Sequence, residues 1–318
     1  MLEKIAQDYK SNFNNSSSYY KYLSKVTPDN FDLIDVKKAL YPKKIFIIYN
    51  PSAGIKLDKK SEIAQKMDEN NIPYEMYTTI GFLDTMKIAL NFEIDNYSAI
   101  VAVGGDGTCH EVVNGLMSRP DKKKLPICFL PNGSGNDLCG SLELNDFETG
   151  LNALVKGQII KVDLFKILLD HENENTITGN KIDFMRYCII NSSLLLVGSS
   201  ARKAVPLKPY VGKKAYTITA IFEILRMFVG KYDIDIDNGQ QILKDVETQY
   251  MQVYNGKFGG GRIMLNPLGL INDGYMELVF IKQLFGGLGW PVKALGMFHY
   301  AKNGGTHFYD NDFVCMRC

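Results

Sequence analysis

Two glycine-rich loops constrain the fold of this chain more than any other feature. The loop Gly104–Thr108 (GGDGT) follows the apolar run AIVAV, and the loop Pro131–Asp137 (PNGSGND) follows the apolar run ICFL. A third loop, Asn50–Gly54, ends the apolar run KIFIIY in the same way. Short apolar runs that alternate with helical patterns indicate the buried strands of a parallel sheet with helices on both faces.

These loops have the composition of phosphate-binding turns. At the carboxyl ends of parallel strands, glycines let the backbone approach a ligand closely and turn its N–H groups toward anions. The amino terminus of a following helix adds partial positive charge, which favours phosphate. A single glycine-rich loop is often no more than a turn. Three such loops in strand–loop–helix register predict a nucleotide-binding site.

The first part of the chain alternates regularly between strand and helix patterns. We expect strands at 44–50, 74–78, 99–103 and 127–130, and helices at 59–70, 83–92, 109–117 and 146–156. After about residue 158 helical patterns become rare. There we expect strands within 159–169, 183–191, 233–237, 249–256 and 275–281, and helices at 213–229 and 285–298. The second part is therefore predicted to be a mostly antiparallel layer.

The predicted domain boundaries follow from these changes of pattern. Residues 1–42 are rich in Ser, Asn, Tyr and Lys, and they are expected to form an extension ahead of the first compact domain. Residues 43–160 are the expected α/β nucleotide-binding domain, and residues 161–318 are the expected β domain.

Composition excludes several classes of protein. The chain has 318 residues, with 36 Lys and Arg against 35 Asp and Glu and a net charge of +1. This balance lacks the basic footprint of a nucleic-acid-binding protein, so no nucleic-acid partner is expected. No apolar stretch is long enough to span a membrane, the start of the chain lacks a signal peptide, and the six cysteines are scattered. We therefore expect a cytoplasmic protein without a transmembrane segment.

The loop motifs exclude two common nucleotide sites. No GxxxxGK[ST] occurs, and no GxGxxG follows a strand. Instead the first loop carries a carboxylate, Asp106, between glycines. Phosphates would repel this carboxylate unless it binds a metal, orients a metal-bound water or accepts a proton. This combination points to phosphoryl transfer with Mg²⁺.

Three strings occur in order within residues 43–318: VAVGGDGTCHEVVNGL, PNGSGNDL and NGKFGGGRIMLNPLGLINDGYMEL. Together they resemble the diacylglycerol kinase, sphingosine kinase and ceramide kinase family of lipid kinases, and the third string is similar to the bacterial members. NAD kinases and phosphofructokinases share GGDG within the same superfamily, but the third string is not expected in them.

The resemblance implies two domains. The first would be a Rossmann-like parallel α/β nucleotide-binding domain, and the second a mostly antiparallel β-sandwich lid. ATP would bind between them, and the lipid would enter from the second domain. The implied reaction is ATP- and Mg²⁺-dependent transfer of phosphate to a primary hydroxyl of a lipid presented at a membrane surface, by a protein associated with that membrane peripherally.

The resemblance also assigns candidate nucleotide-binding residues. Gly104–His110 match the phosphate loop of the family. Asn50 and Ser52 match its first loop, Thr79 matches a threonine after its second strand, and Ser134 matches a hydroxyl of its later loop. The candidate set is Asn50, Ser52, Thr79, Gly104, Gly105, Asp106, Gly107, Thr108, Cys109, His110, Gly133 and Ser134.

A candidate metal site lies in the third string. Asp273 matches a Mg²⁺-ligating carboxylate of the bacterial branch, where the carbonyls of Leu270 and Tyr275 would complete the protein ligands. Oxygen-only ligation of this kind suits a hard cation. Asn-Asp-Gly is also a common hairpin turn, and a turn and a ligand are compatible.

The catalytic base has two candidates. Family members usually carry an acidic DGE-like motif on a strand near the C-terminus. This sequence ends in FYDNDFVCMRC, where Asp310 and Asp312 are the nearest acids, so the β domain is expected to lack its last strand. Sphingosine kinases are thought to use the GGDG aspartate, which favours Asp106 as the base. A missing C-terminal acid is the alternative.

The expected substrate residues are Asn136, Asp137 and Arg202. In the sphingosine branch an acid grips the amine of the lipid, whereas Arg202 stands in that place here and would repel a sphingoid ammonium. The acceptor is therefore expected to be diacylglycerol. A sphingoid base or ceramide kinase, an NAD-kinase-like enzyme with a soluble substrate, and an inactive relative that binds nucleotide or lipid are alternatives. A homodimer is left open. The helix at 213–229 is expected to pack in the lid or to touch the bilayer.

Overall fold

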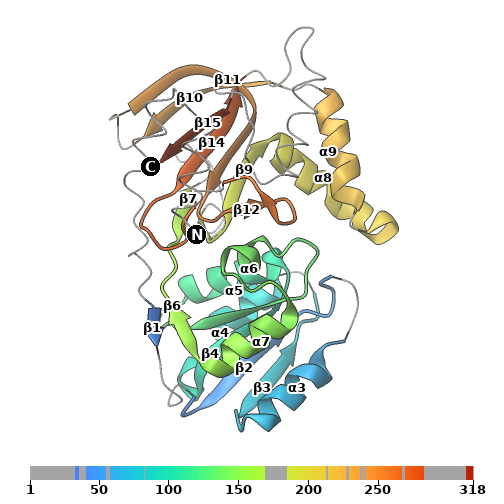
Figure 1. Cartoon of the computed structure of the whole chain (residues 1–318), viewed down its shortest axis with the longest axis vertical. Helices are drawn as coiled ribbons and strands as arrows, with labels where there is room; N and C mark the ends of the chain where they lie inside the picture. The colour runs from blue at the N-terminus through green and yellow to red at the C-terminus, as the bar shows by residue number, and fades with distance from the viewer. Residues whose placement is uncertain are drawn as a thin grey trace, which may run out of the picture. The chain divides into compact units, whose positions relative to one another are not determined.

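The computed structural model describes residues 33–35, 41–54, 58–81, 83–168, 185–212, 214–226, 229–236, 239, 241–266, 269–282 and 313–317. Packing divides the chain into two compact units (Figure 1). The N-terminal unit is Phe31–Ile189, and the C-terminal unit contains the chain from Ile190 onward. Most of the predicted extension, the predicted helix at 285–298, Asp310 and Asp312 lie outside the described residues.

The N-terminal unit is built on a four-stranded parallel sheet in the order β3-β2-β4-β5. Its strands are β2 (Lys44–Tyr49), β3 (Tyr74–Thr78), β4 (Tyr97–Gly104) and β5 (Ile127–Pro131). Consecutive side chains of β2 are fully buried, as expected for a central strand covered on both faces. The predicted parallel sheet is confirmed.

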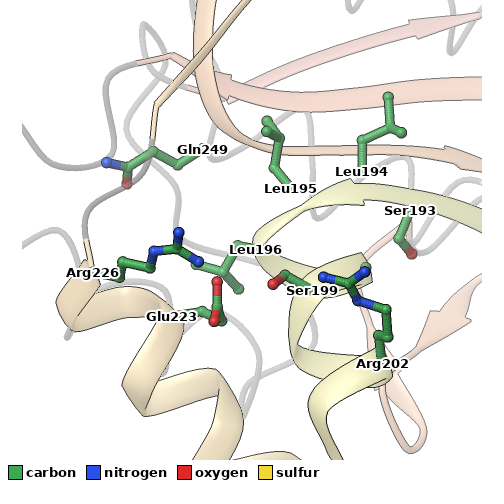
Figure 2. A pocket seen from close by; sticks show the side chains of 10 residues that line it. Ser193, Leu194, Leu195, Leu196, Ser199, Arg202, Glu223, Arg226 and Gln249 are labelled. Atoms are coloured by element: carbon green, nitrogen blue, oxygen red, sulfur yellow. The ribbon is translucent and has the colours of Figure 1, made fainter.

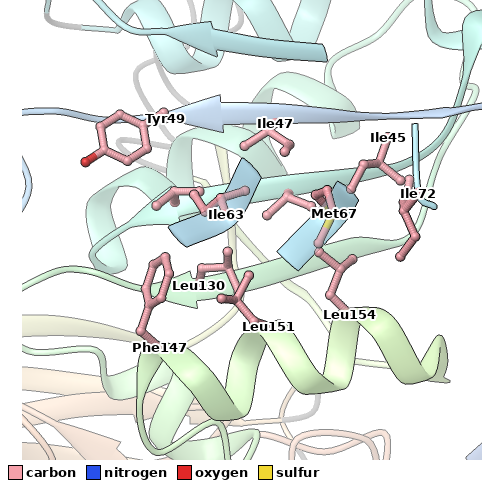
Figure 3. Packing of buried hydrophobic residues seen from close by; sticks show 13 residues of the cluster. Ile45, Ile47, Tyr49, Ile63, Met67, Ile72, Leu130, Phe147, Leu151 and Leu154 are labelled. Atoms are coloured by element: carbon pink, nitrogen blue, oxygen red, sulfur yellow. The ribbon is translucent and has the colours of Figure 1, made fainter. Parts of the chain in front are cut away.

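Helices cover both faces of this sheet. They are α3 (Lys60–Glu69), α4 (Asp84–Asn91), α5 (Asp106–Met117), α6 (Asp137–Ser141) and α7 (Phe147–Lys156), with a 3₁₀ turn at Ile94–Asn96. On one face, Ile45 and Ile47 pack against Met67 of α3 and Leu151 of α7 (Figure 3). On the other face, Phe46 stacks on Phe92, with ring centres 4.9 Å apart. Alternate side chains of β2 therefore point to opposite faces of the sheet and contribute to a hydrophobic core on each face.

Two features of this unit differ from the sequence-based expectation. Helix α5 begins at Asp106 rather than 109, so the last three residues of the GGDGT motif already form its first turn. A short strand β1 (Leu33–Asp35), inside the predicted extension, pairs antiparallel with β6 (Gln158–Ile160). Three-residue strands have too little pattern to be recognised from sequence.

The N-terminal unit extends beyond the predicted boundary at 160. Strands β7 (Phe165–Leu168) and β8 (Met185–Cys188) form an antiparallel pair. Asn114 of α5 fastens β8 with two bonds: its Oδ1 accepts from the Tyr187 N–H at 2.9 Å, and its Nδ2 donates to the Tyr187 carbonyl at 2.9 Å. This side-chain clip therefore attaches β8 to the N-terminal unit, which ends at Ile189.

The C-terminal unit is mostly antiparallel, as predicted. Its main sheet runs β10-β11-β14-β15, and β9 also pairs with β11. The strands are β9 (Asn191–Leu195), β10 (Gly230–Ile236), β11 (Gln241–Tyr254), β14 (Glu277–Lys282) and β15 (Phe313–Arg317). A small hairpin of β12 (Phe258–Gly259) and β13 (Ile263–Met264) lies between β11 and β14 in the chain. No strand was predicted from the sequence at the position of β15.

Two helices follow β9 and pack as a pair, α8 (Leu196–Val211) and α9 (Lys214–Arg226) (Figure 1). Helix α9 confirms the helix predicted at 213–229. Helix α8 was not predicted, because Gly198, Pro206 and Pro209 all disfavour a helix interior.

Asn114 provides a test of the clip between α5 and β8. Asn114→Ala should lower the free energy of unfolding by about 2 kcal/mol or more, since the backbone groups of Tyr187 lose their partners in a buried site. Asn91→Ala is the matched control, because Asn91 is also helical and also bonds the carbonyl four residues earlier, but is exposed. Its effect should stay within about 0.5 kcal/mol. Equal effects in denaturant unfolding would contradict the role of the clip.

Candidate active site

The strand order of the parallel sheet has its topological switch point between β2 and β4, at their carboxyl ends. The chain leaves β2 for β3 on one side and then crosses to β4 on the other side of β2. Loops that follow two such neighbouring strands diverge, and ligands of open α/β sheets bind at this point. The loop at Asn50–Gly54 follows β2, and the GGDGT motif follows β4. The predicted loops therefore lie at the position where the fold favours a ligand.

Hydrogen bonds join these loops into one structure. The backbone N–H of Asn50 donates to the Val103 carbonyl at 3.0 Å, and the Asn50 side-chain amide donates to the Thr108 hydroxyl at 2.9 Å. The N–H of Asn132 donates to the Gly104 carbonyl at 2.8 Å. The loops after β2, β4 and β5 are thus directly connected, as their placement on one sheet edge predicts.

Two backbone contacts bring the loops closer than side chains allow. A Cβ on Gly54 would lie 2.0 Å from the Asn132 carbonyl oxygen, and Gly54 also has a φ of 70°. A Cβ on Gly133 would lie 2.3 Å from the Cα of Gly105. These glycines therefore serve loop-to-loop packing, which the sequence alone could not separate from a role in ligand approach. Gly107 differs, because a Cβ there would meet nothing within 4 Å.

Asn136 shapes the loop after β5. Its Oδ1 accepts from the Gly133 N–H at 2.9 Å, its Nδ2 donates to the Gly133 carbonyl at 3.0 Å, and its φ is 60°. The side chain predicted to contact substrate is thus engaged within its own loop. Asp137, the next predicted substrate residue, begins α6 and is buried. Contact of either residue with a substrate stays a prediction.

Asp106 links the first loop to α6. It is the first residue of α5 and is partly exposed, and its Oδ1 accepts from the Leu138 N–H at 3.1 Å. One carboxylate oxygen is therefore fixed by a backbone donor. This bond orients the carboxylate at the start of a twelve-residue helix, whose amino terminus favours negative charge.

The remaining predicted nucleotide residues have different surroundings. Thr79 is buried after β3, and its N–H donates to the Tyr49 carbonyl at 2.9 Å. Cys109 is buried, and a hydrogen bond with Cys139 together with burial raises the pKa of its thiol well above the usual value. Burial and the charge of Arg186 lower the pKa of His110. Ser52 and Ser134 stand in their predicted loops, Ser52 with its N–H bonded to Asn50 Oδ1.

The candidate metal residues form a turn before β14. The Tyr275 N–H donates to Asp273 Oδ1 at 3.1 Å, Gly274 has a φ of 76°, and Leu270 is buried. The predicted turn is therefore present. Its donor set, a carboxylate and backbone carbonyls, fits a hard cation. Among the described residues, no cluster of three or more His, Cys, Asp or Glu side chains forms a metal site.

Arg202 lines a cavity of about 470 Å³ within the C-terminal unit (Figure 2). Leu194 and Leu195 of β9 line it, and so do Arg226 of α9 and Gln249 of β11. Gln249 is 2% exposed, and neither of its amide atoms has a hydrogen-bond partner among the described residues. The wall therefore combines apolar side chains, two guanidinium groups and an unsatisfied amide.

One acid, Glu223, also lines this cavity. Burial raises its pKa, but hydrogen bonds from Lys203 and Ser199 and the charges of Lys203 and Arg226 outweigh burial, so the pKa lies below its usual value. Sequence reasoning found Arg202 and missed the other lining residues. They come from four separate elements between 193 and 249, and no local motif connects them.

Comparisons with known proteins agree with the motifs. Residues 44–167 match the family model of the diacylglycerol kinase catalytic domain. Diacylglycerol kinases of Staphylococcus aureus strains JH9 and Newman are 27% identical over 249 residues, which cover 76% of this chain and 71% of each relative. This domain match and these relatives support the predicted family, that of the diacylglycerol-kinase-like lipid kinases.

Solved structures share the fold. A diacylglycerol kinase structure from Bacillus anthracis aligns with a TM-score of 0.61 at 18% identity, covering 87% of this chain and 84% of that chain. Another structure from the same bacterium aligns with a TM-score of 0.63 at 20% identity, covering 88% and 85%. At these identities the likeness concerns the fold. The described helices include none with the length and apolar character needed to cross a bilayer.

Two glycine substitutions separate ligand approach from loop packing. Gly107→Ala should keep or raise stability by up to about 1 kcal/mol, since alanine favours the helix and its Cβ meets no atom. It should weaken binding of a non-hydrolysable ATP analogue by about tenfold if the backbone there approaches phosphate. Gly133→Ala should lower both stability and binding, because its Cβ separates the loops. Titration calorimetry and thermal unfolding measure both. Unchanged binding in Gly107→Ala would contradict close approach at this residue.

Proposed function

We propose that this protein is an ATP- and Mg²⁺-dependent lipid kinase that phosphorylates a primary hydroxyl, with diacylglycerol as the acceptor. The observation that supports this most is the set of three hydrogen-bonded loops at the carboxyl ends of β2, β4 and β5. These loops carry the GGDGT motif within the part of the chain that matches the catalytic domain. The lipid kinases named in the comparisons are diacylglycerol kinases.

The loops would bind the phosphates of ATP. Backbone N–H groups of the glycine-rich turns and the amino terminus of α5 favour anions. The Asn50 amide and the Thr108 hydroxyl lie within hydrogen-bond distance of each other and would present polar groups beside those turns. We assign nucleotide contacts to these residues and to Ser52, Thr79, Gly104, Gly105, Asp106, Gly107, Cys109, His110, Gly133 and Ser134. The thiol of Cys109 is buried, and its backbone N–H donates to the Gly105 carbonyl at 3.1 Å.

Asp106 is the proposed base. It would accept the proton of the lipid hydroxyl while the hydroxyl oxygen forms a bond to the γ-phosphorus and the bond between that phosphorus and ADP breaks. The bond from the Leu138 N–H would hold the carboxylate in one orientation through this step. Positioning of this kind supplies much of the rate in phosphoryl transfer.

Asp273, with the carbonyls of Leu270 and Tyr275, would hold Mg²⁺. When bound, the cation would neutralise phosphate charge. The turn offers oxygen donors alone, which is the ligand type that Mg²⁺ prefers.

The cavity beside Arg202 is the proposed acceptor pocket. Its leucines suit an apolar chain, and Arg202 and Arg226 disfavour a cationic sphingoid base. The one acid that lines it, Glu223, is ion-paired with Lys203. These surroundings favour an uncharged or anionic acceptor. The protein would meet its lipid as a cytoplasmic protein bound peripherally to a membrane.

Transfer of labelled phosphate from ATP tests the reaction. Five acceptors should be compared: diacylglycerol, ceramide, sphingosine and monoacylglycerol in mixed micelles, and NAD in solution. We expect label in diacylglycerol. Label in NAD alone would support a soluble-substrate kinase. No label, with ATP still bound, would support an inactive relative.

Asp106→Asn should reduce phosphate transfer by about a hundredfold to ten-thousandfold, since the amide cannot accept the proton. The fold should persist, because the amide oxygen can still accept from Leu138. Asp106→Ala should lose both the reaction and stability. Asp146→Asn is the matched control, because Asp146 also accepts from a backbone N–H near a helix start, at 2.7 Å. Full turnover in Asp106→Asn would exclude the base role.

Asp273→Asn should raise the Mg²⁺ concentration needed for half-maximal transfer by about tenfold, since one negative ligand charge is lost. The Tyr275 N–H can still bond the amide oxygen, so the turn should persist. Asp245→Asn removes an exposed acid of the same unit, ion-paired with Lys231, and should leave the Mg²⁺ dependence unchanged. A Mg²⁺ titration in which both variants match the wild type would remove Asp273 from the proposed site.

A further inference from the structure

The pair of helices α8 and α9 exposes large apolar side chains. More than half of the exposed large hydrophobic residues in the described part of the chain lie on these two helices. Tyr210 is 85% exposed, Val205 63% and Phe222 59%. We call the surface of the pair that is turned away from the contact between the two helices the outer face; its main residues are Val205, Tyr210, Tyr216, Ile218, Ile221 and Phe222. Large apolar side chains exposed together on two adjacent helices indicate a binding surface.

The residues at the contact between the two helices, in contrast, are small or polar. Among the side chains that the structure describes, the buried residues of α9 are Ala215, Thr219 and Glu223, at four-residue spacing, and those of α8 are Ser200 and Ala204. The Thr219 hydroxyl donates to the Ser200 carbonyl at 3.0 Å. A helix pair exposed only to water normally buries its large apolar side chains. Small or polar residues at the contact between helices, with many large apolar residues exposed, are typical of helices that contact lipid.

The charges on these helices are mostly positive. Helix α8 carries no acid, and Glu223 is the one acid of α9. Glu223 is 6% exposed and ion-paired with Lys203, so it offers little negative charge to the surface. The cations of the two helices are Arg202, Lys203, Lys208, Lys214 and Arg226. Arg202 and Arg226 line the cavity, and Lys203 is paired with Glu223, so Lys208 and Lys214 are the cations that favour an anionic partner at the outer face.

Two lysines lie beside aromatic rings of the outer face. The Lys208 ammonium is 4.7 Å from the ring centre of Tyr216, and the Lys203 ammonium is 5.2 Å from that of Phe222. Aromatic rings next to long cationic side chains are typical of surfaces placed between lipid headgroups and acyl chains, where the ring is buried and the ammonium stays at the headgroups.

We propose that the outer face of α8 and α9 docks on the surface of an anionic phospholipid bilayer. This inference rests on the proposed lipid kinase function, because docking on a bilayer would bring the protein to its lipid substrate. Residues of α8 and α9 also line the cavity beside Arg202, so the helices that would dock on the bilayer also form part of the proposed acceptor pocket. A second copy of the chain is a poorer occupant, because a symmetric contact would bring the same cations together.

Sedimentation of the full chain with vesicles tests the docking. Vesicles of phosphatidylcholine with phosphatidylglycerol should bind the protein, and pure phosphatidylcholine should bind it more weakly. The double variant Tyr210→Ser/Phe222→Ser should partition about tenfold or more weakly, since two large apolar groups no longer enter the bilayer. Ile242→Ser is the matched control, because Ile242 is 52% exposed in the same unit but lies on β11. It should bind as the wild type does.

A charge variant tests the choice of an anionic surface. Lys208→Glu/Lys214→Glu should reduce binding to phosphatidylglycerol vesicles and weaken its dependence on salt. Circular dichroism should show that all variants keep their helices. Phosphate transfer to a short-chain diacylglycerol in detergent micelles should remain close to that of the wild type, since none of these residues is assigned to the site.

Three results would overturn the docking proposal. The first is that the wild type does not bind anionic vesicles. The second is that the Tyr210→Ser/Phe222→Ser variant binds them as strongly as the wild type does. The third is that the wild type self-associates without binding vesicles and that this variant does not self-associate. The last would assign the outer face to a second copy. Vesicle binding that depends on the outer face, together with no phosphate transfer to any lipid, would support docking and reject the kinase proposal, so the two failures are distinguishable.

Discussion

The close approach of three loop backbones is the constraint on which the candidate site depends. Gly54 meets the Asn132 carbonyl, and Gly133 meets Gly105, at separations that exclude any side chain. The parallel strand order brings these loops to one edge, and the glycines let them touch there. Asp106 can reach the Leu138 N–H because the loops are this close. The position of the acid therefore follows from backbone packing at residues that have no side chain.

Much of the N-terminal unit could be predicted from sequence, because its strands are uniformly apolar and its loops carry glycine at marked positions. The same reasoning could not assign each glycine a purpose. Gly133 packs against another loop, whereas Gly107 faces open space. The start of α5 was predicted at residue 109 and lies at Asp106, because glycine and aspartate next to a strand are more typical of a turn than of the first turn of a helix. Asn136 was expected to meet substrate and instead braces its own loop.

The C-terminal unit was harder to predict, and the reasons are physical. Helix α8 contains two prolines and a glycine, and its stability comes from packing against α9 rather than from helix propensity. The cavity beside Arg202 is assembled from β9, α8, α9 and β11, so its lining has no periodic signal. Hydrophobic patterning also misleads here, because many large apolar residues of α8 and α9 are exposed, while the residues of these helices described as buried are small or polar.

The buried thiols behind the loops give the molecule an internal reporter. Cys109 of α5 and Cys139 of α6 are almost fully buried. Each lies in a helix that follows one of the loops of the site. A thiol reagent can reach them only when α5 and α6 separate, so the rate of modification measures how often this region opens. Because the raised pKa keeps the Cys109 thiol protonated, closed molecules should react slowly even in alkaline buffer. A ligand that holds the loops together would then be detected by slower labelling, without any assay of turnover.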